Sequence, residues 1–145
     1  FGATPIFPMG VYSFHYDPDT YIPPSVAMDT YEMDDDAANA TDLFPPDYQY
    51  HTFDEPFDDD WYRVNLAAGQ TLVVETFETG MIQADTVVEI YDMGMSLVAT
   101  NDDKLPGTDV YSYVEYNAPA AGDYYVLIWE YDFEIGEYDV EFNVY

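Results

Sequence analysis

The chain has 145 residues, enough for one domain with an extension, and 48% are hydrophobic and 19% aromatic, which favours a packed core over disorder. It carries 30 Asp and Glu against two Lys and Arg, a formal net charge of −28. Phosphate backbones need a basic surface, so nucleic acid is excluded as a partner, and anionic membranes are disfavoured. No apolar run is long enough to span a membrane, so we expect no membrane insertion. The absence of cysteine excludes disulfides and thiolate metal sites.

Residues 1–30 differ in character from the rest of the chain. Their prolines block helix and interior strand positions, and aromatic residues lie between them. We therefore expect an extended N-terminal segment that serves as an assembly arm or linker, with Tyr12, Phe14 and Tyr16 as assembly contacts. The chain begins Phe-Gly-Ala-Thr-Pro without an initiating Met, as a processed chain does. This start favours a cleaved signal peptide and an extracellular location.

From residue 48 onward, short runs of alternating apolar and polar residues follow one another, separated by turn signals such as Ala67–Gln70 and Ala118–Gly122. Only Asp35–Leu43 has the pattern of a helical turn. The spacing predicts an all-β fold, an antiparallel β-sandwich of jelly-roll type with about eight strands. The expected strands are residues 48–53, 61–66, 71–77, 85–91, 96–100, 110–116, 123–131 and 137–145.

The aromatic residues divide into two groups. Trp61, Tyr91, Tyr125 and Trp129 alternate with other residues within expected strands, and we place them in the core. The others exceed what one small core can hold, so some form either a contact face or ordinary edge-strand surface. These others are Tyr111, Tyr113, Tyr116, Tyr131, Phe133, Tyr138 and Tyr145.

Two acidic runs, residues 34–36 and 58–60, crowd carboxylates together. Charges this close need a cation, shifted pKa values or open solvation. Asp58 and Asp60 share one face if their run is extended. A second acidic group combines Asp85, which opens an expected strand, with Asn101–Asp103, which follows the next one. The alternative for that group is capping of the loop by Asx turns.

Several segments, taken in order, resemble the bacterial pre-peptidase C-terminal domain family. They are Asp60–Arg63, Ala68–Thr71, Ala84–Asp92, Asn101–Asp103, Ala118–Val126 and Gly136–Val140. The resemblance covers residues 31–145, which we therefore take as the sandwich domain. It implies a jelly-roll-like β-sandwich of the kind that serves as an accessory domain on secreted peptidases. The collagen-binding domains of clostridial collagenases are related to this family.

The resemblance also implies calcium. Relatives hold the ion between a Glu-Pro-Asn/Asp-Asp motif and an Asp-x-Asp-Trp/Tyr motif, which appear here as Glu32–Asp35 and Asp58–Trp61, with Met33 in place of the usual proline. The implied Ca²⁺ ligands are Glu32, Asp34, Asp35, Asp58 and Asp60. A possible second site comprises Asp85, Asn101, Asp102 and Asp103. The alternative for the first set is that these residues are solvated loop charges.

No enzymatic motif is visible. The two histidines, His15 and His51, belong to no His-Glu-x-x-His arrangement, and no nucleophile motif surrounds any of the four serines. We therefore expect no enzyme. Asn39-Ala40-Thr41 is a sequon, which makes Asn39 a possible glycosylation site.

Two functions remain open. In the first, the protein is a secreted calcium-binding structural subunit that polymerises with itself through its N-terminal segment into a filament or matrix. In the alternative, it is an accessory domain of a secreted peptidase that binds an extracellular protein or polysaccharide matrix.

Overall fold

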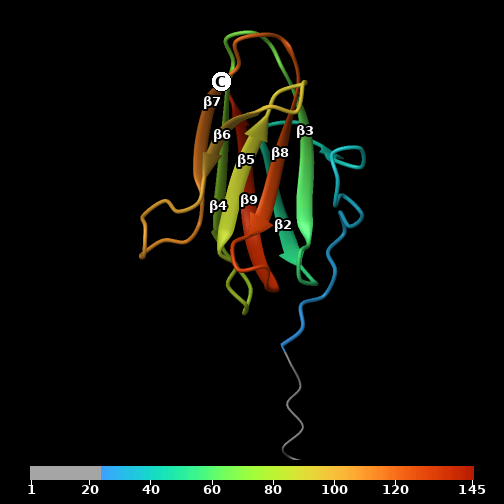
Figure 1. Ribbon diagram of the computed structural model, residues 1–145, viewed down its shortest axis with the longest axis vertical. Helices are drawn as coiled ribbons and strands as arrows, with labels where there is room; N and C mark the ends of the chain where they lie inside the picture. Colours follow the sequence, from blue (N-terminus) through green and yellow to red (C-terminus); the bar gives the residue numbers. More distant parts are fainter. Residues whose placement is uncertain (1–23) are drawn as a thin grey trace, which may run out of the picture.

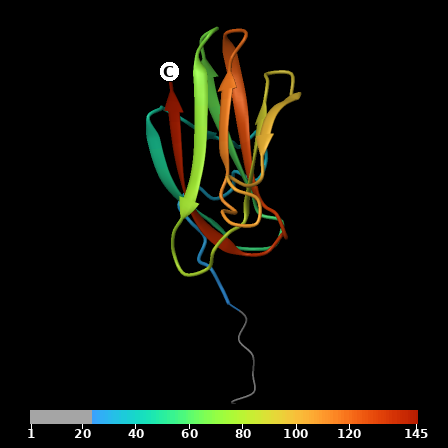
Figure 2. The ribbon, with the colours of Figure 1, turned by 90° about the vertical axis from the view of Figure 1, so that its left-hand side faces the viewer.

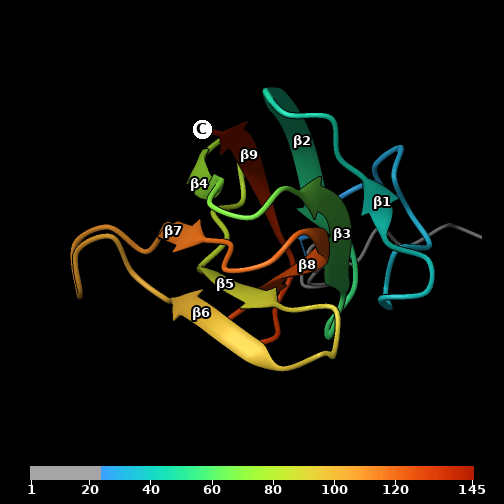
Figure 3. The ribbon, with the colours of Figure 1, turned by 90° about the horizontal axis from the view of Figure 1, so that it is seen from above.

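The computed structural model describes residues 24–145 and folds them into a β-sandwich (Figure 1). One sheet has the strand order β1-β3-β8-β5-β6 and the other has the order β2-β9-β4-β7. Viewed from the side and from above, the sheets form two facing layers (Figures 2 and 3). The strands are β1 (Thr41–Asp42), β2 (Asp47–Phe53), β3 (Asp59–Leu66), β4 (Thr71–Glu78), β5 (Thr86–Tyr91), β6 (Leu97–Asn101), β7 (Tyr113–Asn117), β8 (Gly122–Glu130) and β9 (Gly136–Val144).

The strand pairing is antiparallel with one exception. β8 lies between β3 and β5, and β9 lies between β2 and β4. Only the two-residue strand β1 runs parallel to its neighbour, β3. The predicted all-β sandwich is therefore confirmed, and β1 adds a ninth strand to the eight expected.

The helical turn expected at Asp35–Leu43 does not form, and residues 24–145 contain no helix. Instead, the Asp36 carboxylate accepts hydrogen bonds from the backbone N–H groups of Ala38 and Asn39, at 2.9 and 3.0 Å. Aspartate side chains compete in this way with helical backbone bonding. The chain closes a tight turn here and then enters β1.

The core lies between the sheets and follows the two-residue period of the strands. Tyr62, Val64 and Leu66 of β3 are buried, while the residues between them are exposed. Phe142 of β9 packs against Tyr62 with ring centroids 4.9 Å apart. Burying each such side chain contributes about 1.5–3 kcal/mol, so the sandwich does not depend on disulfides.

The structure corrects the placement of four aromatic residues. Trp61, Tyr91, Tyr125 and Trp129 are only partly buried and lie outside the core cluster. Their chain neighbours face inward instead, as Tyr62 and Ile128 show with no exposed surface. Conversely, Tyr138 and Tyr111, which belonged to the surplus aromatic group, are buried. The alternation in sequence predicts where the strands lie. It does not predict which set of alternate residues faces the core, because apolar residues occupy both faces of these strands.

Residues ahead of the expected domain boundary already contact the sandwich. The Thr52 backbone N–H donates to Asp29 Oδ2 at 2.8 Å, and the Thr52 hydroxyl donates to the Ala27 carbonyl at 3.0 Å. The N-terminal segment is therefore fixed to β2 from Ala27 onward. Within the described residues, no helix has the length and apolar character needed to cross a membrane.

The one arginine and the one lysine of the chain are held in ion pairs. Arg63 Nη2 lies 2.6 Å from Asp42 Oδ1, and Lys104 Nζ lies 2.9 Å from Glu75 Oε1. Lys104 also donates to the Thr76 carbonyl at 2.6 Å and lies 4.3 Å from the centroid of the Phe77 ring. Neither positive charge is therefore left to offset the acidic clusters.

Candidate functional site

Three carboxylates meet where the stretch that precedes β1 passes the start of β3. Glu32, Asp35 and Asp58 each offer an oxygen, and these oxygens lie within 4.8 Å of one another. The Trp61 backbone N–H donates to the Asp34 carbonyl at 3.0 Å and holds the segment in place. Met33 has a φ of 86°. Proline is fixed near −65°, so the proline expected from the resemblance would not fit this backbone.

The two other predicted ligands, Asp34 and Asp60, are buried beside this cluster but bonded elsewhere. Asp34 Oδ2 accepts from the Thr41 hydroxyl at 3.0 Å. Asp60 Oδ2 accepts from the Tyr138 hydroxyl at 2.5 Å, and that hydroxyl lies 2.8 Å from the Tyr62 hydroxyl. The structure thus groups three of the five predicted residues and gives the other two partners of their own.

Burial and neighbouring acids oppose the ionisation of two members of this cluster. Burial and the charges of Asp29, Asp54 and Asp60 raise the pKa of Glu32 to about 7. Burial, Asp60 and Glu32 raise the pKa of Asp58 to about 8, against the effect of its bond to the Asp54 backbone. Glu32 Oε1 is buried and has no hydrogen-bond partner. A buried carboxylate oxygen that lacks a hydrogen-bond donor is suited to bind a cation.

The second predicted group also comes together in part. Oxygens of Asp85, Asp102 and Asp103 lie within 4.8 Å of one another. Asp85 Oδ1 is buried without a partner, and burial together with Asp102 and Asp103 raises the pKa of Asp85 to about 6. Asn101 is engaged differently: its Oδ1 accepts from the Tyr113 backbone N–H at 2.9 Å, and its Nδ2 donates to the Asp103 carbonyl at 3.2 Å. Asn101 therefore shapes the loop.

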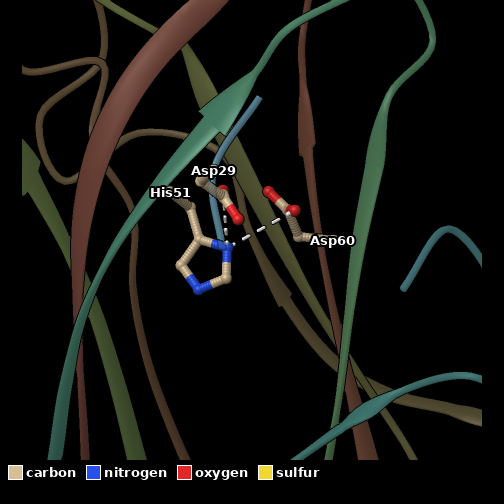
Figure 4. Close-up of side chains that lie close together, drawn as sticks. All are labelled: Asp29, His51 and Asp60. Carbon is tan, nitrogen blue, oxygen red and sulfur yellow. Dashed lines mark ion pairs between the residues drawn. The ribbon is translucent and has the colours of Figure 1, made fainter. Parts of the chain in front are cut away.

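A third cluster escaped the sequence analysis. Figure 4 shows His51 of β2 facing Asp29 of the N-terminal segment and Asp60 of β3. Burial lowers the pKa of His51, but the two carboxylates outweigh burial and raise it to about 9. No motif links these residues, because three separate segments supply them. Only the pairing of the strands brings them together.

The outer surface of the five-stranded sheet carries a second apolar layer. Strand register places Trp61 beside Leu127 and Tyr91 beside Tyr125, so these side chains share one side of the sheet. Trp61 packs against Tyr91 with ring centroids 5.5 Å apart, and Trp129 stacks on Phe133 at 5.5 Å. A shallow hollow there is lined by Asp59, Glu89, Leu127, Trp129 and Phe133. We call this surface the aromatic face; it comprises Trp61, Tyr91, Tyr125, Leu127, Trp129 and Phe133.

Asn39 is exposed, and its Nδ2 donates to Asp36 Oδ1 at 3.1 Å. Tyr12, Phe14 and Tyr16 lie outside the described residues. His51, the one histidine in the described part of the chain, is wholly buried, so it presents no base to a substrate.

Comparisons with known proteins agree with this architecture. Residues 58–128 match the model of the bacterial pre-peptidase C-terminal domain. No curated protein matches the chain. Among solved structures, the pre-peptidase C-terminal domain of the Bacillus anthracis collagenase is similar, at TM-score 0.51 and 16% identity, over 73% of this chain and 94% of that one.

Two periplasmic inhibitors of g-type lysozyme share the fold as well. The PliG of Aeromonas hydrophila has TM-score 0.56 and 14% identity, over 73% of this chain and 96% of that chain. The PliG of Salmonella Typhimurium has TM-score 0.52 and 16% identity, over 73% and 98%. At such identities the likeness concerns the fold.

Fold and strand order define the class as a two-sheet β-sandwich, a fold shared with the collagenase domain and the PliG proteins. More narrowly, residues 58–128 belong to the bacterial pre-peptidase C-terminal domain family.

Proposed function

We propose that this protein is a secreted, non-catalytic module whose fold is completed by calcium. One observation carries the proposal. Glu32, Asp35 and Asp58 each place an oxygen within 4.8 Å of the others, and Glu32 Oε1 is buried without a hydrogen bond. Oxygen-only donors with several carboxylates suit Ca²⁺, which takes six to eight oxygens at about 2.3–2.6 Å.

Calcium at this point would join two parts of the chain. Glu32 and Asp35 come from the stretch that precedes β1, whereas Asp58 directly precedes β3. Asp34 and Asp60 lie within electrostatic reach, since Asp60 raises the pKa of both Asp34 and Asp58. The ion would hold the segment against the sandwich and relieve the repulsion among these acids.

Calorimetric titration of chelator-treated protein with Ca²⁺ tests the proposal. Asp58→Asn should weaken binding strongly, because it removes a charged ligand from the cluster. Glu55→Gln is the matched control: it removes one charge from an exposed residue in the same loop that lies outside the cluster. Equal calcium affinity in both variants would refute the site.

The aromatic face favours a second role, the binding of an extracellular protein or polysaccharide matrix. Phe133 is 45% exposed, and Trp129 lies beside it above the hollow. Aromatic side chains are enriched in the contact surfaces of proteins. Pull-down on insoluble collagen and on cellulose tests this role: Trp129→Ala should lower retention, whereas Tyr113→Ala, an exposed aromatic residue on β7 of the other sheet, should not. Equal retention of both variants and the parent protein would refute it.

Self-assembly through the N-terminal segment remains the proposal for residues 1–23. Its support is the anchoring of Ala27 and Asp29 to β2, which fixes the point from which the preceding chain starts. Subunits with a charge of −28 would repel one another, so assembly should require calcium.

A further inference from the structure

The cluster of Asp29, His51 and Asp60 is enclosed and nearly dry. His51 Nδ1 lies 3.3 Å from Asp29 Oδ2 and 3.5 Å from Asp60 Oδ1 (Figure 4). The side chains of Asp29 and Asp60 are 3% and 2% exposed, and that of His51 is fully buried. The rings of Tyr31 and Tyr138 stack on His51, with centroids 4.6 and 5.7 Å away. One imidazole and two carboxylates thus lie together in a buried site bordered by two tyrosine rings.

The hydrogen bonds of His51 assign its two nitrogens different roles. Nε2 lies 2.9 Å from Gln49 Oε1, and Gln49 Nε2 donates to Asp47 Oδ2 at 3.1 Å. Because the amide N–H of Gln49 is directed at Asp47, its oxygen faces the ring, and Nε2 must carry the proton of that bond. Nδ1 is buried and makes no hydrogen bond with acceptable geometry. It points between the two carboxylates and lies within ion-pair distance of both.

Each carboxylate is also fixed from behind. Asp29 accepts from the backbone N–H groups of Tyr31 and Thr52, at 2.7 and 2.8 Å. Asp60 Oδ2 accepts from the Tyr138 hydroxyl, which leaves Oδ1 directed at His51. Metal ligands typically have such outer partners, which hold the ring and the carboxylates in position for the ion.

We propose that His51 Nδ1, Asp29 and Asp60 form a binding site for a small divalent transition-metal ion, with Zn²⁺ as the probe. Zinc bonds to nitrogen and oxygen are about 2.0–2.2 Å, so tetrahedral ligands lie about 3.3–3.5 Å apart. The measured Nδ1 to oxygen separations are 3.3 and 3.5 Å. The divalent charge also neutralises both buried carboxylates, which a single imidazolium does not.

The donor set separates this site from the calcium cluster. Calcium prefers oxygen ligands only and more of them, whereas imidazole suits zinc and related ions. The zinc takes the place of any proton on Nδ1, and that proton passes to solvent. The bound ion would tie the N-terminal segment to β2 and β3 independently of calcium.

The test uses the full chain after chelation, with excess Ca²⁺ present to occupy the carboxylate clusters. We expect calorimetry to show one Zn²⁺ bound per chain, and ¹⁵N spectra of the imidazoles to show His51 Nδ1 shifting to a metal-bound position. His51→Gln should abolish this binding, while His15→Gln, which changes the only other histidine, should retain it. Gln49→Ala should weaken zinc affinity about 10- to 100-fold, because Gln49 orients the ring.

Two results would overturn the proposal. One is equal zinc affinity in His51→Gln and the parent protein. The other is an Nδ1 that stays protonated in the parent protein at saturating Zn²⁺, which would leave the cluster as an internal ion pair only. This second readout needs no variant, so a poorly folded His51→Gln does not weaken the test. Asp58→Asn separates the two metals, since it should lose calcium and keep zinc.

Discussion

In calcium-free buffer, the stability of this protein should fall as pH rises from about 4 to about 8. Unfolded Asp58 and Glu32 titrate near 3.8 and 4.5, whereas in the folded protein burial and neighbouring acids raise these pKa values to about 8 and about 7. The folded state therefore holds protons that the unfolded state has released. The resulting stabilisation is full below the unfolded pKa values and is lost as pH rises through the folded ones.

The size of this effect follows from the shifts. One pKa unit corresponds to about 1.4 kcal/mol. Solvent at the border of the cluster screens much of the interaction, so we expect a loss of about 2–3 kcal/mol over this window. For a chain of this size each kcal/mol moves the melting temperature by about 3 °C, which gives a fall of about 6–9 °C.

Thermal melts followed by circular dichroism, in chelator and in excess Ca²⁺, measure this dependence. Calcium binds the ionised carboxylates and should remove the slope. Asp58→Asn should flatten the slope in chelator, while Glu55→Gln should keep it and thereby account for general repulsion among the acids. The reasoning fails if the two variants and the parent protein share one pH profile in chelator.

Three further outcomes are expected. Tyr138→Phe removes the hydroxyl bonded to Asp60 and Tyr62, so denaturant titration should show a loss of about 2–3 kcal/mol; an unchanged midpoint would contradict the importance of this bond. Deletion of residues 1–25 spares the anchors at Ala27 and Asp29, so the melting temperature should not change. The same deletion should abolish calcium-dependent polymers in electron micrographs. Polymers that persist after the deletion would exclude these residues as the assembly segment. Asp85→Asn should raise the melting temperature in chelator at pH about 8, because the pKa of Asp85 is raised to about 6 and the ionised carboxylate destabilises the fold. If the second cluster binds Ca²⁺, the same variant should also show a smaller rise in melting temperature when Ca²⁺ is added. An unchanged melting temperature under both conditions would exclude this cluster as a calcium site.

The architecture was predictable because local signals agreed with one another. Alternation marked β3, β8 and β9, and Gly122 and Gly136 stand at the first residues of β8 and β9. The phase of β3 was less accessible. Trp61 and Tyr62 are adjacent aromatic residues, and only the packing of Tyr62 against Phe142 decides which of them faces the core.

The candidate sites show the same limit of local information. Crowding of Asp34–Asp36 and Asp58–Asp60 pointed to a cation, and the resemblance joined the two runs. The hydrogen bond that Asp60 accepts from Tyr138 could not be predicted from the sequence, since Tyr138 lies 78 residues away on β9. His51 stood alone in the sequence, and only strand pairing and the path of the N-terminal segment place it beside Asp29 and Asp60.

The ion pairs of Arg63 and Lys104 affect how easily trypsin-like proteases can cleave the folded protein. Enzymes that cleave after Lys or Arg find only Arg63 and Lys104 in this chain. Arg63 lies within β3, hydrogen-bonded between neighbouring strands, and the Lys104 ammonium is tied to Glu75 and the Thr76 carbonyl. Cleavage after Arg63 would first require the sheet to open, and cleavage after Lys104, in the loop between β6 and β7, would require its ammonium to leave these partners, so the folded module should resist trypsin-like enzymes.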